Sequence, residues 1–335
     1  MSRANALLPP CPICKGRMAR DLMPEVSRCA SCGYFASTLP VAINENRGAL
    51  DEDRRMDALA AIRRENFTTI LGRLQATEGF PRQANALEVG CGHGWFLEIL
   101  TKRGYRAAGL EPDMYIAGIA QRAGHDVTIG VFPDALDTGT TFDAIFFNDV
   151  FEHMPNVNAV AESLKRHTGD RGWAVINLPV SGGIIFRIAR LLARVGNRGP
   201  YRRLWQADMP SPHLSYFSAS NIEKLFEKHG FELVVSARLR SITSKGLLDR
   251  VRYDRKLNPV AAYLYYLGAL LLLPALALLP ADIMFFAFRK LPPPSPAKSQ
   301  RPRPPAGSPA HSGRASYRVS GGPRTEETPG DPGQR

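Results

Sequence analysis

Apolar runs and helical patterns alternate through the middle of the chain, from residue 84 to residue 178. The apolar run Ala86–Val89 is typical of a buried strand, and the pattern over Trp95–Lys102 is typical of a helix. A second apolar run, Tyr105–Leu110, predicts the next strand. Further helical patterns lie at about residues 114–123 and 156–167. Strands that alternate with helices predict an α/β fold built on a parallel sheet.

A long helix is predicted before this region, over residues 51–79. Its apolar side chains approximate a single stripe, formed by Met56, Leu59, Ile62, Phe67, Ile70 and Leu74. We expect this helix to link the N-terminal residues to the α/β region.

A glycine-rich turn joins the first predicted strand of the sheet to the helix after it. Gly90, Gly92 and Gly94 stand at alternate positions, so the backbone can turn sharply and approach a ligand closely. The helix that follows favours negative charge at its N-terminus. The next strand ends at Glu111, a place from which a carboxylate can bind two ribose hydroxyls. The two features together predict a site for a nucleotide-like ligand.

The spacing of the glycines separates two families that use such a turn. A dinucleotide site favours Gly-x-Gly-x-x-Gly, whereas this chain has Glu-x-Gly-x-Gly-x-Gly beginning at Glu88. With this motif the sequence resembles the class I S-adenosylmethionine-dependent methyltransferases. The spacing disfavours the alternative of a dehydrogenase.

Other segments match this family in the order in which the family shows them. They are the fourth strand and the segment after it (142–153), the fifth strand (173–179), the approach to the last helix (213–218), the sixth strand (230–234) and the seventh (282–290). The resemblance implies a Rossmann-like α/β fold with a seven-stranded sheet and helices on both faces. It also places the helix of residues 51–79 beside the cofactor.

The resemblance implies a set of residues that bind S-adenosyl-L-methionine. Glu111 would hold the ribose hydroxyls, and Glu88 would order the glycine loop. The full set consists of Glu88, Gly90, Gly92, Gly94, Glu111 and Asn148. The segment Gly130–Phe132 lacks the acid that many relatives place near adenine, so we expect backbone amides and apolar contacts there.

Three residues are candidates for catalysis: Asp149, His153 and His213. Asp149 and its neighbour Asn148 end the fourth strand and face the expected place of methyl transfer. His153 follows that strand, and His213 would lie over the acceptor pocket with Tyr216 nearby. A hydroxyl acceptor must lose a proton, and either histidine could accept it. A structural role for each histidine stays open.

The first 40 residues contain two Cys-x-x-Cys pairs separated by about fourteen residues. This arrangement resembles a zinc ribbon, in which Cys11, Cys14, Cys29 and Cys32 hold one Zn²⁺ tetrahedrally. Four thiolates leave no open position on the metal, so we expect a structural zinc that drives the folding of a small module over residues 1–45. The fifth cysteine, Cys91, is interpreted as a small packed residue.

Two inserts interrupt the methyltransferase pattern of residues 46–290. The first, residues 182–212, contains a basic amphipathic helix at 184–194. Arg187, Arg190 and Arg194 are expected on one side, and the apolar side would consist of Ile184, Ile185, Ile188, Leu191 and Leu192. Such a helix can lie in a membrane surface or cover the substrate pocket.

The second insert, residues 241–281, contains twenty uncharged residues at Val260–Leu279. If the sixth and seventh strands pair antiparallel, both ends of this insert return to the same side, which argues against a single membrane crossing. Pro274 and Pro280 would also break a continuous helix. We expect a segment that dips into the membrane. A true span, or a soluble core or oligomer interface, are the alternatives.

Composition narrows the location of the protein and its partners. Its 335 residues, 44% of them hydrophobic, suffice for a sizeable core. The start, Met1–Pro10, lacks the apolar run of a signal peptide, so we expect a cytoplasmic protein in which cysteines bind metal or stay buried. Residues 291–335 are rich in proline, serine, glycine and arginine and are expected to be disordered.

The net charge of +12 is concentrated in three segments. Residues 187–203 hold six arginines and no acid, residues 241–256 hold five basic and two acidic residues, and residues 291–335 hold seven basic and three acidic residues. Two of these segments flank apolar stretches, which indicates anionic lipid headgroups rather than nucleic acid as the partner. We therefore expect the protein at the inner face of the cytoplasmic membrane, peripheral or integral.

The kind of acceptor is indicated by the two inserts rather than by the core of the methyltransferase fold. A small-molecule or lipid-linked acceptor is expected, such as a glycolipid, a polysaccharide precursor or a prenylated quinone precursor, with methylation on oxygen. The ribbon is also similar to the zinc-binding module with which some sugar methyltransferases begin, which favours saccharides. The alternatives are a catalytically degenerate protein that docks on membranes, and an RNA methyltransferase.

Overall fold

The computed structural model describes residues 8–43, 52–242, 247–248, 260, 263–264, 266–268, 270–271 and 279–292. The described residues all belong to one compact unit. The expected C-terminal tail, residues 291–335, lies outside the described residues except for its first two positions.

A seven-stranded mixed sheet forms the centre of this unit, with strand order β10-β11-β8-β7-β4-β5-β6. Its strands are β4 (Asn85–Val89), β5 (Arg106–Glu111), β6 (Asp126–Ile129), β7 (Phe142–Asn148), β8 (Thr168–Pro179), β10 (Phe231–Leu239) and β11 (Ile283–Lys290). Only β11 runs antiparallel, between β8 and β10. The predicted α/β class and seven-stranded methyltransferase sheet are confirmed.

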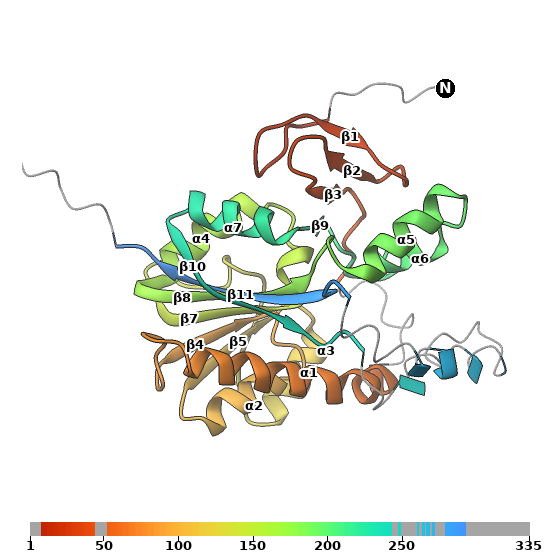
Figure 1. Cartoon of the computed structure of the whole chain (residues 1–335). Coiled ribbons are helices and arrows are strands. Elements are labelled where there is room, and N and C mark those ends of the chain that lie inside the picture. Colours follow the sequence, from red (N-terminus) through yellow and green to blue (C-terminus); the bar gives the residue numbers. More distant parts are fainter. Residues whose placement is uncertain are drawn as a thin grey trace, which may run out of the picture. The chain divides into compact units, whose positions relative to one another are not determined.

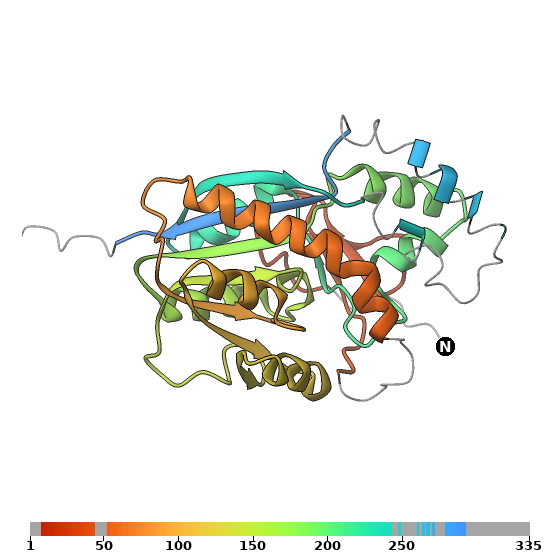
Figure 2. The same ribbon diagram turned by 90° about the horizontal axis from the view of Figure 1, so that it is seen from below.

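Helices cover both faces of the sheet (Figure 1). One face carries α1 (Glu52–Gln75), α2 (Trp95–Lys102) and α3 (Met114–Arg122), and the other carries α4 (Val157–His167) and α7 (Ala219–Lys228). Figure 2 shows α1 lying across the sheet, as the apolar stripe of residues 51–79 predicts. The side chain of Asn66 on α1 exchanges two hydrogen bonds with the backbone of Arg240, so this helix is fastened to the end of β10.

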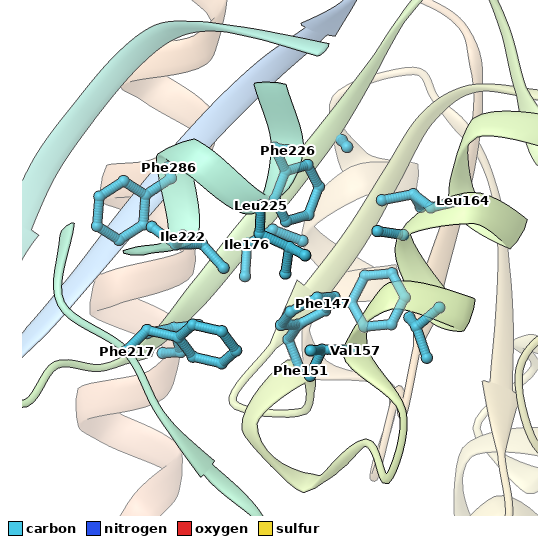
Figure 3. Close-up of a cluster of buried hydrophobic side chains, with 14 of the residues drawn as sticks. Phe147, Phe151, Val157, Leu164, Ile176, Phe217, Ile222, Leu225, Phe226 and Phe286 are labelled. Atoms are coloured by element: carbon cyan, nitrogen blue, oxygen red, sulfur yellow. The ribbon is translucent and has the colours of Figure 1, made fainter. Parts of the chain in front are cut away.

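The core on the α4 and α7 face is largely aromatic (Figure 3). Phe147 of β7 contacts Phe151 edge-on, and Phe151 in turn contacts Phe217 and Phe226. β7 and β8 read as nearly continuous apolar runs because both of their faces are covered.

The N-terminal ribbon shares a second, smaller sheet with the main unit. Its strands are β1 (Met18–Arg20), β2 (Val26–Cys29) and β3 (Phe35–Ser37), and the fourth strand is β9 (Ser215–Tyr216). β3 pairs antiparallel with β9, and the hydroxyls of Tyr34 and Ser215 lie 2.5 Å apart. The ribbon is therefore completed by a strand that lies about 180 positions later in the sequence.

The first insert forms α5 (Ile184–Arg194) and α6 (Gly199–Leu204), and its buried side differs from the prediction. Phe186, Ala189 and Ala193 are buried against the ribbon, whereas Ile188 and Leu191 are 51% and 59% exposed. The expected division into an arginine side and an apolar side is therefore wrong. The reason is an interaction with the ribbon: Arg190, one of the three arginines predicted on the surface, points inward and binds Asp21.

Asp21 and Arg190 form a double hydrogen bond, with distances of 2.6 and 3.2 Å. The exposed side of α5 consequently mixes both residue types. We call it the outer face of α5, made up of Arg187, Ile188, Leu191, Arg194 and Val195.

The second insert leaves and re-enters the sheet at neighbouring positions, since Leu239 of β10 pairs with Ile283 of β11. The strand pairing that argues against a single crossing is thus present. Most of Val260–Leu279 lies outside the described residues, as do 243–246 and 249–259. Among the residues that the structure describes, none of the helices has the length and apolar character needed to cross a bilayer.

Candidate active site

The glycine turn lies between β4 and α2 and needs glycine for two different reasons. Gly90, Gly92 and Gly94 have φ angles of 67°, 54° and 79°, in the left-handed region. A side chain at Gly90 would also collide with Val150, 2.5 Å away. A side chain at Gly92 would meet no atom within 4 Å, and this residue lines the large cavity described below. The turn therefore presents bare backbone to the cavity.

Glu111 ends β5 and is fixed against this turn. Its Oε2 accepts a hydrogen bond from the backbone N–H of Gly92 at 2.9 Å, and its Oε1 accepts one from that of Asp113 at 3.0 Å. The side chain of Asp113 in turn caps the N-terminus of α3. The two features nominated from the sequence, the glycines and the acid, thus lie side by side.

Glu88 and Asn148 form a buried pair behind the turn. The Nδ2 of Asn148 donates to Oε1 of Glu88 at 3.0 Å, while Glu88 Oε2 and Asn148 Oδ1 are buried without a hydrogen-bond partner. Burial raises the pKa of Glu88 to about 8. Asn148 lines the cavity, whereas Glu88 lies behind it and positions Asn148.

A second group of polar side chains follows β7, and we call it the acceptor-end cluster: Asp149, Glu152, His153 and His213. Asp149 adopts φ 55°, and its Oδ2 lies 3.6 Å from Nη2 of Arg63 on α1. Burial raises the pKa of both Asp149 and Glu152, and the neighbouring charge of Asp149 raises that of Glu152 further. All four residues line the same cavity as the glycine turn.

Both histidines of this cluster are held by hydrogen bonds. The Nδ1 of His153 lies 2.9 Å from the carbonyl oxygen of Pro212. The Nδ1 of His213 lies 3.1 Å from the hydroxyl of Tyr216, and its Nε2 lies 2.9 Å from the amide nitrogen of Gln206. Burial, with a smaller contribution from His153, lowers the pKa of His213 well below its usual value. His213 is therefore neutral at physiological pH.

The cavity that joins the two groups has a volume of about 1570 Å³. Ligand pockets in proteins commonly measure about 300–1,000 Å³, so there is room for more than one small ligand. Besides the glycine turn and the acceptor-end cluster, its wall includes apolar side chains from α1 and α5, namely Leu59, Ile62, Ile185, Phe186 and Ala189.

The expected adenine region borders this cavity through Gly130, Val131 and Phe132. Val131 is about half exposed, so an apolar surface is present there. Asp134 also lines the cavity, two residues after Phe132. This acid was not among the residues predicted from the sequence.

The four cysteines of the ribbon come together at the ends of its hairpins. Their sulfur atoms all lie within 4.8 Å of one another, with 3.6 Å between Cys11 and Cys32 and 3.5 Å between Cys14 and Cys29. A tetrahedral zinc with Zn–S bonds of about 2.3 Å separates its sulfurs by about 3.8 Å. A disulfide would need about 2.05 Å. The four thiols therefore fit one metal ion.

The sequence did not single out every residue of the site. Glu152 lies beside His153 in the segment 142–153 but was not predicted as a site residue, although an acid next to a candidate histidine was the available signal. Arg63 and Gln206 have no local signal, because they reach the site only through tertiary packing.

The class of this protein follows from the strand order of the sheet, the glycine turn and the position of Glu111 against that turn. These features together define a class I S-adenosylmethionine-dependent methyltransferase. A family model described as a methyltransferase domain matches residues 58–236, more than half of the chain. The chain belongs to this methyltransferase family. None of the curated protein sequences matches it.

Three solved structures illustrate what the fold is similar to. A cyclopropane synthase from Mycobacterium tuberculosis is 16% identical, with 76% of this chain and 90% of that chain covered and a TM-score of 0.49. Magnesium protoporphyrin IX methyltransferase from Synechocystis PCC 6803 is 12% identical, with coverages of 73% and 90% and a TM-score of 0.45. Phosphoethanolamine N-methyltransferase 2 from Haemonchus contortus is 18% identical, with coverages of 68% and 53% and a TM-score of 0.47. The three names describe different chemistry, so none identifies the acceptor of this chain.

Proposed function

We propose that this enzyme transfers a methyl group from S-adenosyl-L-methionine to a hydroxyl group of a small or lipid-linked acceptor. The observation that supports this is the single cavity that runs from the glycine turn, past the acceptor-end cluster, to the apolar wall of α5. Acceptors with this chemistry include a glycolipid, a polysaccharide precursor and a prenylated quinone precursor.

In this proposal the donor lies on the glycine turn. Its sulfonium supplies a methyl group that is already activated toward attack by a nucleophile. The Glu111 carboxylate, oriented by two backbone N–H groups, holds the ribose hydroxyls. Gly90, Gly92 and Gly94 allow close approach of the ligand, and Asn148, positioned by Glu88, binds it from β7.

The acceptor lies at the other end of the cavity, against the acceptor-end cluster. Holding donor and acceptor collinear removes much of the entropic barrier to the reaction. A hydroxyl acceptor must also lose its proton, and the cluster that contains Asp149, His153 and His213 receives it. The apolar wall formed by α1 and α5 accommodates the lipid part of the acceptor.

We also propose that the enzyme works at the cytoplasmic face of a membrane. The outer face of α5 combines exposed Ile188 and Leu191 with exposed arginines, a combination suited to anionic lipid headgroups. On its inner side the same helix lines the cavity, so a lipid-linked acceptor can reach the site from the membrane along α5. The segment 260–279, which lies largely outside the described residues, adds to this attachment.

The ribbon in this proposal binds one structural Zn²⁺ through Cys11, Cys14, Cys29 and Cys32. The sulfur distances support a single tetrahedral ion. The ion stabilises a module that has few apolar residues of its own, and it leaves no position open for substrate.

The variant Glu111→Ala tests the donor site. Charge-assisted hydrogen bonds are worth about 1.5–3 kcal/mol, so affinity for S-adenosyl-L-methionine should fall roughly 10- to 100-fold in isothermal titration. The affinity of Glu111→Gln should lie between those of the wild type and Glu111→Ala, because glutamine keeps an acceptor for the Gly92 N–H. The matched control is Glu98→Ala on α2, which removes an acid outside the cavity. Absence of binding by the wild type would favour a degenerate, non-catalytic protein.

The acceptor can be identified by incubating membrane extract with the enzyme and methyl-labelled donor. We expect the label in a lipid-extractable or saccharide product that mass spectrometry can identify, with the new methyl group on oxygen. Label on nitrogen or carbon, or on RNA, would contradict the proposed acceptor chemistry. Glu111→Ala serves as the inactive control in the same extract.

A further inference from the structure

Three side chains of metal-binding type meet within the acceptor-end cluster. Glu152 and His153 lie on the short helix η2 (Phe151–His153), and His213 comes from the segment before β9. One ligand atom of each lies within 4.8 Å of the others. Glu152 Oε1 and His213 Nε2 are 3.9 Å apart, which is too long for a hydrogen bond but within the span of two ligands bound to one ion at about 2.0–2.2 Å.

The hydrogen bonds of His213 determine which of its nitrogens carries the proton. The Tyr216 hydroxyl donates its own proton to the carbonyl of Leu204, so it accepts from Nδ1–H of His213. The amide nitrogen of Gln206 can only donate, so it approaches the lone pair on Nε2. His213 therefore presents a basic Nε2 to the cluster, and a metal ion would take the place of the Gln206 amide.

His153 is arranged in the same way. The carbonyl of Pro212 can only accept, so Nδ1 of His153 carries a proton and Nε2 is the basic nitrogen. Metal-binding histidines typically donate one ring N–H to a backbone carbonyl or polar side chain, which fixes the ring and leaves the other nitrogen for the ion. Nδ1 of each histidine is held in this way, and at His213 the ion would displace the Gln206 amide from Nε2.

Glu152 gives an independent indication of a cation site. The residue is 1% exposed, and its Oε2 is buried without a hydrogen-bond partner. An unpaired buried carboxylate oxygen is unfavourable, because it has lost its contact with water and gained no partner in return. A cation bound between the carboxylate and the two imidazoles would satisfy this oxygen.

We propose that Glu152, His153 and His213 bind one divalent transition-metal ion at the acceptor end of the cavity. Two imidazoles and one carboxylate are a ligand set typical of zinc and iron(II) sites that keep positions open for substrate. All three residues line the cavity, so the open positions face the acceptor. This site is separate from the four cysteines of the ribbon, which offer only sulfur.

The role of this ion rests on the proposed methyl transfer to a hydroxyl. An acceptor oxygen bound to the ion becomes more acidic, because the positive charge stabilises the alkoxide. The O–H bond then breaks, and its proton passes to the carboxylate of Asp149 in the same cavity wall. The oxygen forms the new bond to the methyl carbon, and the methyl–sulfur bond breaks with its electron pair on sulfur. The two histidines act as ligands in this scheme.

The number of zinc ions bound per chain tests the site. Full-length protein dialysed against Zn²⁺ should hold two equivalents by elemental mass spectrometry, one of them in the ribbon. Glu152→Gln, which preserves shape, and His213→Ala should each hold one. His229→Ala, a partly exposed histidine that hydrogen-bonds Asn158 and Glu162, is the matched control and should hold two. Tyr216→Phe should weaken binding of the second zinc roughly 10- to 100-fold in competition with a chelator.

A wild type with one equivalent, or a Glu152→Gln/His213→Ala double variant that keeps two, would overturn the proposed site. Isothermal titration with S-adenosyl-L-methionine on the same samples separates this inference from the proposed function. Donor binding with a single zinc refutes only the metal site. Two zinc ions without donor binding refute only the methyltransferase proposal.

Discussion

The buried carboxyl group of Glu88 makes the stability of the folded protein depend on pH. The carboxyl group accepts a hydrogen bond from Asn148, and burial raises its pKa to about 8. Near neutral pH the folded protein therefore keeps this group protonated, whereas the unfolded chain ionises it above a pKa near 4.5. Folding is thus penalised progressively as pH rises from about 4.5 to about 8.

We predict that Glu88→Gln stabilises the protein at neutral pH while keeping the shape of the side chain. Since one pKa unit corresponds to 1.36 kcal/mol, the gain at pH 7 should be up to about 3 kcal/mol, and it should vanish near pH 4.5. Denaturant titrations of wild type and variant between pH 4.5 and 8 measure it. The exposed substitution Asp126→Asn should give a curve parallel to the wild type. A constant difference between Glu88→Gln and wild type would contradict the assigned burial effect.

Residues of the site were predictable where one local motif determines them. The glycine turn and Glu111 belong to a strand-turn-helix-strand unit, so their spacing in sequence fixes their spacing in space. The contacts of the acceptor-end cluster are not local, because the bonds of His213 come from Gln206 and Tyr216 and depend on how α6 and β9 pack. Asp282 is a similar case: its Oδ1 accepts from the N–H of Ile185 at the start of α5, 97 positions away.

At the scale of the element, α5 shows why an amphipathic pattern does not by itself identify the buried side. Its sequence offers arginines and large aliphatic residues at mixed positions, and two assignments of the buried side are possible. The ribbon decides between them: Phe35 packs on Phe186 with ring centroids 5.2 Å apart, and Asp21 binds Arg190. Ile188 and Leu191, which were expected on a side separate from the arginines, consequently share the exposed side with Arg187 and Arg194.

We predict that the double variant Ile188→Glu/Leu191→Glu loses binding to anionic lipid vesicles. Burial of an aliphatic side chain in the membrane contributes about 1.5–3 kcal/mol, so vesicle affinity should fall at least tenfold. Both side chains are exposed, so stability should change by no more than about 0.5 kcal/mol per substitution. Vesicle sedimentation measures the binding. Ile129→Glu, at an exposed aliphatic position on β6, is the matched control.

The arginines of the outer face of α5 should contribute to vesicle binding independently of Ile188 and Leu191. Arg187→Ala and Arg194→Ala should each weaken binding by about 1 kcal/mol at low salt, and the difference should shrink as ionic strength rises. Equal binding of wild type and the Ile188→Glu/Leu191→Glu variant would show that α5 does not contact the bilayer.

For the whole molecule, the parallel sheet follows from the alternation of strands and helices in the sequence, whereas the seven strands and the helices on both faces were implied by the family resemblance. The union of ribbon and catalytic unit was not predictable, because β9 is two residues long and carries no periodicity of its own. The ribbon also hydrogen-bonds α4, where Nδ2 of Asn158 donates to the carbonyl of Pro12 at 3.0 Å. The predicted domain boundary at residue 45 therefore separates two segments of the sequence that pack against each other in the structure.

We predict that removing zinc from the ribbon disturbs the acceptor side of the enzyme and spares the donor side. The four-cysteine site stabilises β1–β3, whose loss frees β9 and one side of α5. Hydrogen exchange should accelerate at Ser215 and Tyr216 and along α5, with little change at Gly90–Gly94. Zinc should restore the chelated wild type but not Cys29→Ser. Uniform acceleration across the sheet would instead indicate global unfolding.

The pairing of Leu239 with Ile283 has a consequence for engineering this enzyme. Two residues paired across neighbouring antiparallel strands are about 5 Å apart, a gap that a two-residue hairpin turn can bridge. Residues 240–282 could thus be exchanged for a tight loop without altering strand register, provided that the cap which Asp282 gives to α5 is supplied another way. The catalytic sheet would then become a scaffold in which the insert between β10 and β11 is interchangeable.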